Sequence, residues 1–102
     1  MEPTDAGSNL LALADCAVDL RAGSVRLGTG EVRRLTPAEG RLLACLAERP
    51  GADVDRDELA RRMRVGSCRT VDVTVRRLRA KLGDTPNPRH ILTSHGVGYR
   101  LT

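Results

Sequence analysis

Aromatic residues are almost missing from this sequence. Among its 102 residues Tyr99 is the one aromatic side chain, and Phe and Trp do not occur. The apolar residues, 40% of the chain, are therefore almost all Leu, Val and Ala, so the core must be aliphatic. The shortage also argues against binding of single-stranded nucleic acid, because proteins of that class usually stack bases on aromatic rings.

Cysteines are also few, and their arrangement argues against two classes of small protein. The three residues are widely spaced and include no Cys-x-x-Cys pair: Cys16, Cys45 and Cys68. Neither a disulfide framework nor a zinc site is expected, and His90 and His95 have no Cys or acidic partner at ligand spacing. We expect free thiols in a reducing cytoplasm, with no metal and no cofactor.

Long apolar runs and catalytic motifs are absent as well. No apolar stretch approaches the length of a membrane span, and the N-terminus lacks the pattern of a secretory signal. No G-x-x-x-x-G-K-[ST] or G-x-G-x-x-G phosphate loop occurs, and no Ser, His and Asp set indicates a nucleophilic triad. The sequence therefore predicts a cytoplasmic protein that is neither an enzyme nor a membrane protein.

The length leaves room for one domain. Residues 1–9 are mostly small and polar and contain one Gly and one Pro, which is typical of a disordered leader or the end of a linker. The domain itself is expected to span residues 10–102.

Positive charge is concentrated in one part of the chain. The formal net charge is only +4, but residues 56–82 contain eight Arg and one Lys against three acidic residues. Residues 1–20, by contrast, contain four acidic residues and no Lys or Arg. Such a field suits a polyanion, although on charge alone a solvated charged face stays open as an alternative.

Hydrophobic spacing predicts an order of strands, helices and a hairpin. From residue 10 to residue 35, short apolar clusters recur between turn signals, a pattern typical of several short antiparallel strands. The period changes at Thr36, where a Thr cap, Pro37 at the first helical position and Glu39 form a capping box. We expect the first helix to begin there and to end at residues 49–51, Arg-Pro-Gly.

Two more helices and a hairpin follow. Asp55 as a cap, with Glu58 three residues later, predicts a short second helix. A third helix is expected from about residue 68 to Leu82, before Gly83. Apolar residues at 91–93 and 99–101 flank a glycine-containing segment, which is typical of a β-hairpin.

The third helix has two opposite faces. Four apolar residues form one narrow stripe that should face the core: Val71, Val75, Leu78 and Leu82. The opposite face holds Val73, Arg76, Arg77 and Ala80, with Arg69 on the same side and Thr74 and Lys81 on its flank. A surface helix that is basic for solubility alone is the competing interpretation.

Such a helix fits the major groove of B-DNA. There Arg can pair with guanine and Val73 can touch a thymine methyl, while Arg69, Thr74, Arg79 and Lys81 would reach phosphates. The hairpin tip, residues 95–98, is small enough to enter a minor groove, with His95 or Arg100 as a polar tip. Tyr99 could bond a phosphate or pack between hairpin and helix, and both interpretations stay open.

These motifs resemble the OmpR/PhoB-type winged-helix effector domains of bacterial two-component response regulators. The resemblance covers about residues 10–102, and the matching strings are LTPAE at 35–39, RLL at 41–43, DEL at 57–59, RTVDV at 69–73, VRRLR at 75–79, KL at 81–82 and GVGYR at 96–100. It implies an α+β winged helix-turn-helix, with a four-stranded antiparallel N-terminal sheet, three helices and a C-terminal hairpin wing.

The resemblance also implies a function and assigns residues to it. It implies regulation of transcription by sequence-specific binding to double-stranded DNA, in head-to-tail pairs on direct repeats. The third helix would lie in the major groove and the wing at the minor groove. The implied base-reading residues are Val73, Thr74 and Arg77, and the implied backbone contacts are Arg69, Arg76 and Arg79 on the helix with Thr93 and Tyr99 at the wing. Asp72 is expected to be structural, orienting a neighbouring Arg or the helix start.

Three departures from the family's pattern bear on that function. His95 stands where the family often has an Arg, so wing affinity is expected to be weaker and to rise as His protonates at lower pH. Gly40 replaces a large aromatic, and we expect a neighbour to fill the core there. The connection from Arg64 to Cys68 is shorter than the loop that touches RNA polymerase in relatives, so activation and repression stay open. A protein-interaction module without DNA readout is the alternative function.

Overall fold

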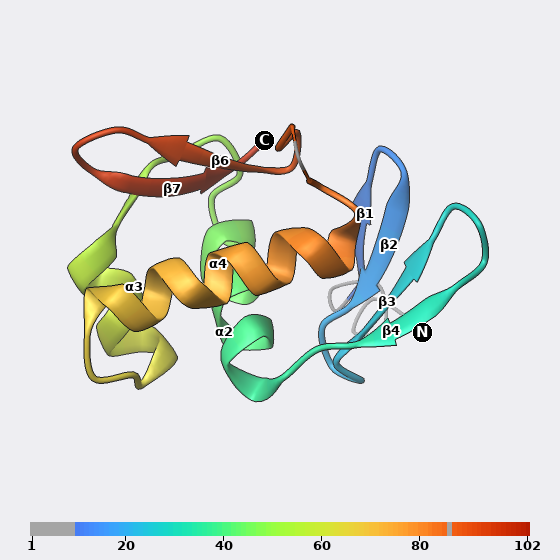
Figure 1. Ribbon diagram of the computed structural model, residues 1–102, viewed down its shortest axis with the longest axis horizontal. Coiled ribbons are helices and arrows are strands. Elements are labelled where there is room, and N and C mark those ends of the chain that lie inside the picture. Colours follow the sequence, from blue (N-terminus) through green and yellow to red (C-terminus); the bar gives the residue numbers. More distant parts are fainter. Residues whose placement is uncertain (1–9, 86) are drawn as a thin grey trace, which may run out of the picture.

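The first four strands form one antiparallel sheet (Figure 1). The computed structural model describes residues 10–85 and 87–102, so the leader expected at 1–9 lies outside the described residues. The strands lie in chain order: β1 (Leu10–Leu13), β2 (Cys16–Asp19), β3 (Ser24–Leu27) and β4 (Val32–Arg34). Val18 and Val25 pair across β2 and β3 and are fully buried, so this pair turns one face of the sheet to the core. The predicted N-terminal sheet is confirmed.

Helix α2 (Pro37–Ala47) begins at the predicted capping box. The Thr36 hydroxyl accepts from the Glu39 backbone N–H, and the Glu39 carboxylate accepts from the Thr36 N–H. The helix buries Leu42, Leu43 and Leu46 completely. Its start therefore follows from local side-chain chemistry and its orientation from an aliphatic face.

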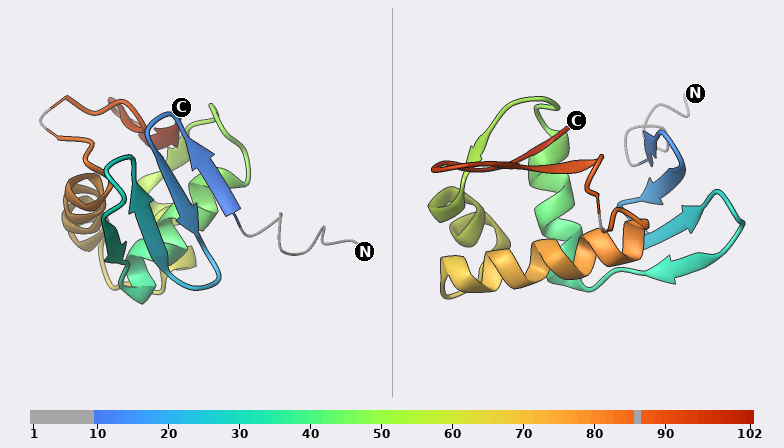
Figure 2. Two further views of the ribbon diagram at one scale, coloured as in Figure 1. Left: turned by 90° about the vertical axis from the view of Figure 1, so that its right-hand side faces the viewer. Right: turned by 45° about the horizontal axis from the view of Figure 1, so that its top comes forward.

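Helices α3 (Arg56–Met63) and α4 (Cys68–Leu82) follow and pack against α2 and each other. Asp55 caps α3 by accepting from the N–H groups of Asp57 and Glu58. Ser67 caps α4, and Gly83 ends it in the left-handed conformation with φ of 72°. Figures 1 and 2 show α4 running from α3 at its N-terminal end to the β1–β4 sheet at its C-terminal end. No described helix is long and apolar enough to cross a bilayer.

The predicted stripe on α4 is the part of that helix that enters the core. Four residues are at most 1% exposed: Val71, Val75, Leu78 and Leu82. They belong to one cluster with the buried leucines of α2 and with Leu59 and Met63 of α3. The aliphatic core inferred from the composition is confirmed.

The wing is a hairpin that gains a third strand. Strands β6 (Ile91–Ser94) and β7 (Gly98–Leu101) pair as predicted, and β5 (Val54–Asp55) adds to the other edge of β7. A Cβ on Gly98 would lie 2.0 Å from the Val54 carbonyl oxygen, so only glycine permits this pairing. The sequence predicted no strand at 54–55, because two residues carry no periodicity.

One expectation about the core is wrong. Gly40 has open space where a side chain would stand, since no atom lies within 4 Å of the position of a Cβ. It lines a surface hollow of about 390 Å³ together with Leu20, Leu35 and Ala44. The neighbours thus leave the place of the missing aromatic open. Apart from this hollow and strand β5, the α+β winged-helix architecture is the one expected.

Candidate nucleic-acid interface

The outer face of α4 presents three arginines to solvent. Arg69, Arg76 and Arg77 are exposed, and among residues 10–85 and 87–102 none of them has an ion-pair or side-chain hydrogen-bond partner. Val73 is half-buried between them along the helix, and Ala80 is exposed. The face therefore combines exposed cations with small side chains, which lets a ligand approach the helix closely.

The N-terminal end of α4 adds to the positive field. Ser67 accepts from the Thr70 N–H, while Arg69 stands exposed in the first turn. Helix N-termini carry a partial positive charge and unbonded N–H groups, so an anion is favoured at this end. The charge of Arg69 adds at this end to the partial positive charge and the unbonded N–H groups of the helix.

Thr74, expected on the flank of that face, is buried. Its side chain is only 6% exposed, and its hydroxyl donates to the Thr70 carbonyl oxygen at 2.7 Å. Thr74 lies one turn after Val71 and one turn before Leu78, so it borders the core stripe. This burial and this bond argue against the predicted base contact, so we do not carry Thr74 into the proposed interface.

Arg79 and Lys81 are engaged inside the domain. The Arg79 guanidinium donates twice to the Ile91 carbonyl, at 3.0 and 2.8 Å, and once to the Thr93 hydroxyl at 3.0 Å. Lys81 Nζ lies 2.7 Å from a Glu39 carboxylate oxygen and 2.8 Å from the Arg34 carbonyl oxygen. Both side chains were expected to reach phosphates, but here they join α4 to the wing and to α2.

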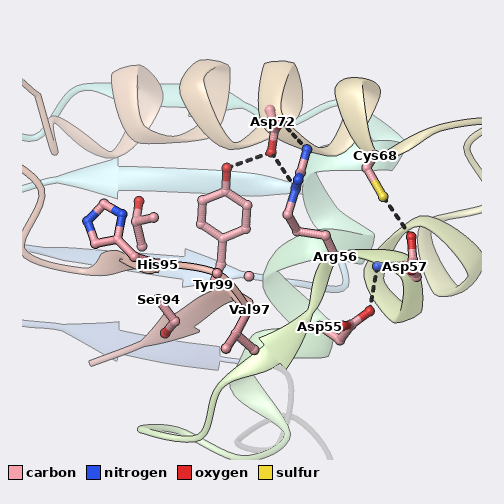
Figure 3. A pocket seen from close by; sticks show the side chains of 12 residues that line it. Asp55, Arg56, Asp57, Cys68, Asp72, Ser94, His95, Val97 and Tyr99 are labelled. Carbon is pink, nitrogen blue, oxygen red and sulfur yellow. Dashed lines mark hydrogen bonds and ion pairs between the residues drawn. The ribbon is translucent and has the colours of Figure 1, made fainter.

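Of the two interpretations of Tyr99, the structure favours packing between the hairpin and the helix. It is 8% exposed, and its hydroxyl donates to Asp72 Oδ1 at 2.7 Å. Burial, together with this bond, raises the pKa of Tyr99 to about 12. Asp72 also accepts from Arg56 Nε at 3.2 Å and from its NH2 at 2.5 Å, so one carboxylate joins α3, α4 and β7 (Figure 3). The structural role predicted for Asp72 is confirmed, and the phosphate role predicted for Tyr99 loses its basis.

A cleft of about 450 Å³ separates α4 from the hairpin. Figure 3 shows Asp72, Arg56 and Tyr99 along one side and His95, Ser94 and Val97 along the hairpin, with Cys68 and Asp57 at the α3 end. Cys68 Sγ donates to Asp57 Oδ1 at 2.9 Å, and this bond raises the pKa of the thiol. The carboxylates of the cleft are therefore mostly engaged with neighbours.

The hairpin tip remains exposed. His95 and Val97 stand out at the turn, where Gly96 adopts φ of 80°. Arg100 is exposed, with NH1 3.7 Å from an Asp53 carboxylate oxygen, and Thr93 is exposed while accepting from Arg79. The tip thus offers an imidazole and a small turn, whereas Arg100 has an acidic neighbour.

The comparison with protein families agrees with this geometry. Residues 30–101 match the family model described as "Transcriptional regulatory protein, C terminal". The chain belongs to this family.

Relatives and solved structures extend the match over most of the chain. This chain is 48% identical over 77 residues to the transcriptional regulatory protein AfsQ1 of Streptomyces coelicolor. The aligned segment covers 71% of this chain and 34% of AfsQ1. The response regulator DrrB of Thermotoga maritima, an OmpR/PhoB homolog, superposes with a TM-score of 0.80 at 35% identity, covering 92% of this chain and 44% of DrrB. The Klebsiella pneumoniae RstA DNA-binding domain, solved in complex with the RstA box, gives 0.76 at 33% identity, covering 91% and 96%. The chain thus spans less than half the length of AfsQ1 and DrrB.

The connection between α3 and α4 is short, as expected. Four residues separate Met63 from Cys68. The connection begins at Arg64, a non-glycine residue with φ of 62°, whose N–H closes α3. Little backbone therefore projects beyond the two helices.

Sequence spacing missed a cluster at the opposite end of α4. His90 Nε2 lies 2.6 Å from Asp15 Oδ1, although the two residues are 75 positions apart. Arg89 bonds the other oxygen of Asp15, and the pKa of Asp15 is lowered, chiefly by the bond to His90. The prediction that His90 has no acidic or Cys partner is correct along the sequence and wrong in space.

Proposed function

We propose that this domain binds double-stranded DNA in a sequence-specific manner to control transcription, with α4 in the major groove and the β6–β7 wing at the minor groove. The observation that carries this proposal is the outer face of α4, where Arg69, Arg76 and Arg77 have no partner within the described chain. Arginines held ready in this way suit phosphates and guanine edges. The RstA domain, of similar fold, was solved on its DNA box, which supports the same use here.

The contacts divide by residue. Val73 and Arg77 are the base readers we propose, and Arg69 and Arg76 bind phosphates on either side. Arg79, Lys81 and Tyr99 act by holding α4 against its neighbours. At the wing, Thr93 is left for the DNA backbone, and His95 and Arg100 for the minor groove.

The setting of the domain is part of the proposal. We infer that it acts in a cytoplasmic response regulator and binds direct repeats as head-to-tail pairs. A contact with RNA polymerase would have to use a surface other than the short connection at 64–67. The relatives AfsQ1 and DrrB are more than twice the length of this chain, which leaves room there for other functions.

Selection of bound duplexes from a random pool at near-physiological salt tests the proposal. We expect a direct repeat to be enriched, with a preference of about 10³ or more over a scrambled duplex. Arg77→Ala should flatten this preference. Arg26→Ala is the matched control, because Arg26 is an exposed arginine that lies on strand β3 and not on α4. If no motif is enriched and binding disappears with modest salt, the DNA-reading assignment fails and a protein-interaction module takes its place.

A further inference from the structure

Three possible metal ligands from the two ends of the described chain meet beside the β1–β2 turn. They are Asp15 and Cys16, at the start of β2, and His90, directly before β6. One ligand atom of each lies within 4.8 Å of the other two. Cys16 and His90 are 7% and 4% exposed, whereas Asp15 is exposed, so the group has buried walls and one open side.

The donor set matches one class of ion. A thiolate, an imidazole and a carboxylate are the ligands that Zn²⁺ takes in proteins, and oxygen-preferring ions such as Mg²⁺ do not select sulfur. We propose that Asp15, Cys16 and His90 form a binding site for a zinc-class divalent cation. This site lies away from the outer face of α4 and does not depend on the proposed DNA binding.

The surrounding charges favour a cation at this place. Asp84 is fully buried and accepts from the N–H groups of Arg89, His90 and Ile91, which fixes the backbone that carries the imidazole. A divalent cation bound here would supply the positive charge that a Cys16 thiolate needs.

Two contacts compete with the ion. His90 Nε2 is hydrogen-bonded to one oxygen of Asp15, and Arg89 occupies the second oxygen. Both contacts must break when the ion binds. The three ligands fill three positions of a tetrahedral ion, and the fourth position is left for water. The site should therefore be weaker than a four-ligand structural zinc site, and removal of Arg89 should strengthen it.

Co²⁺ titration of the full chain under reducing conditions tests the site, since Co²⁺ reports a thiolate ligand through its charge-transfer absorption. We expect one Co²⁺ per chain, displaced by Zn²⁺. Cys16→Ser should abolish the charge-transfer band, and His90→Gln should weaken binding at least tenfold. Cys45→Ser is the matched control, because Cys45 is 6% exposed and belongs to no described ligand cluster, and it should keep the band.

Arg89→Ala gives a result that a purely structural network would not. Arg89 is exposed, so its loss should leave the domain folded and tighten Co²⁺ severalfold. The proposal is overturned if the wild-type chain shows no charge-transfer band, if the band survives Cys16→Ser, or if Arg89→Ala leaves the affinity unchanged or weaker. If Cys16→Ser does not fold, X-ray absorption of the wild-type zinc complex decides instead. One sulfur ligand supports the site, and none or two refutes it.

Discussion

The two parts of α4 use the same kind of side chain for opposite purposes. On its outer face, Arg69, Arg76 and Arg77 have no partner among the described residues, whereas Arg79 and Lys81 are bonded to the wing and to Glu39. The engaged pair lies where the helix meets other elements, as Figure 1 shows for its C-terminal end. A cation on this helix is therefore available to DNA only where no other element of the domain lies within its reach.

The largest effect we expect comes from removing Lys81, one of the two cations of α4 that are bonded within the domain. Lys81→Ala should lower the free energy of unfolding by about 2 to 4 kcal/mol, because Glu39, 1% exposed, loses its cationic partner. Urea denaturation measures this. Adding Glu39→Gln should recover part of the loss, since Gln keeps the capping box without a buried charge. If Lys81→Ala instead leaves stability unchanged and weakens all DNA alike, Lys81 is a phosphate contact after all.

Substitutions on the outer face of α4 should change the affinity for DNA and leave the stability of the domain unchanged. Arg77→Ala should cost about 1 to 3 kcal/mol on the preferred duplex and much less on a scrambled one. Titration of both duplexes by fluorescence anisotropy gives the difference. An equal loss on both duplexes would move Arg77 from base reading to backbone contact.

Tyr99 tests the link between α4 and the wing through pH. Its raised pKa, about 12, means that the unfolded chain loses the phenol proton first, so stability should be complete below about pH 10 and fall as the pH rises toward 12. Tyr99→Phe should remove this alkaline decline and cost about 1 kcal/mol at neutral pH. Tyr99 is the sole tyrosine, so phenolate absorbance follows its ionisation directly. Ionisation near pH 10 in the folded protein would contradict the bond to Asp72.

The smallest effect should come from a single phosphate contact. Arg76→Ala should weaken all duplexes similarly, by less than about 1 kcal/mol at physiological salt, and reduce the salt-dependence slope by about 1. Arg76→Lys should keep the slope, because it keeps the charge. A sequence-dependent loss would instead make Arg76 a base reader.

Local patterns predicted most of the fold. The Thr36 capping box, the apolar stripe of α4 and the glycines of the hairpin each depend on residues within one or two turns, which is the range that sequence spacing describes. The choice between competing partners is not local. Whether Arg79 bonds Ile91 or a phosphate depends on a strand twelve residues away, and the Asp15–His90 contact spans 75 positions.

Burial at the edge of a pattern was equally hard to predict. Thr74 lies beside the stripe, and a wheel alone does not say how far the core extends around the helix. Strand β5 was not predicted, because its two residues form a strand only through their pairing with β7. The DNA contacts assigned to the exposed arginines thus stay predictions, whereas the side chains of Thr74, Arg79, Lys81 and Tyr99 are engaged by contacts within the domain.

The glycine at position 98 connects the wing to helix α3 through strand β5. Strand β5 lies against β7 only because Gly98 has no side chain, and the next residue after Val54 is Asp55, which caps α3. The wing and the first turn of α3 are therefore joined through β5, and α3 packs on α4. Any residue other than glycine at position 98 would thus disturb the cap of α3 as well as the wing.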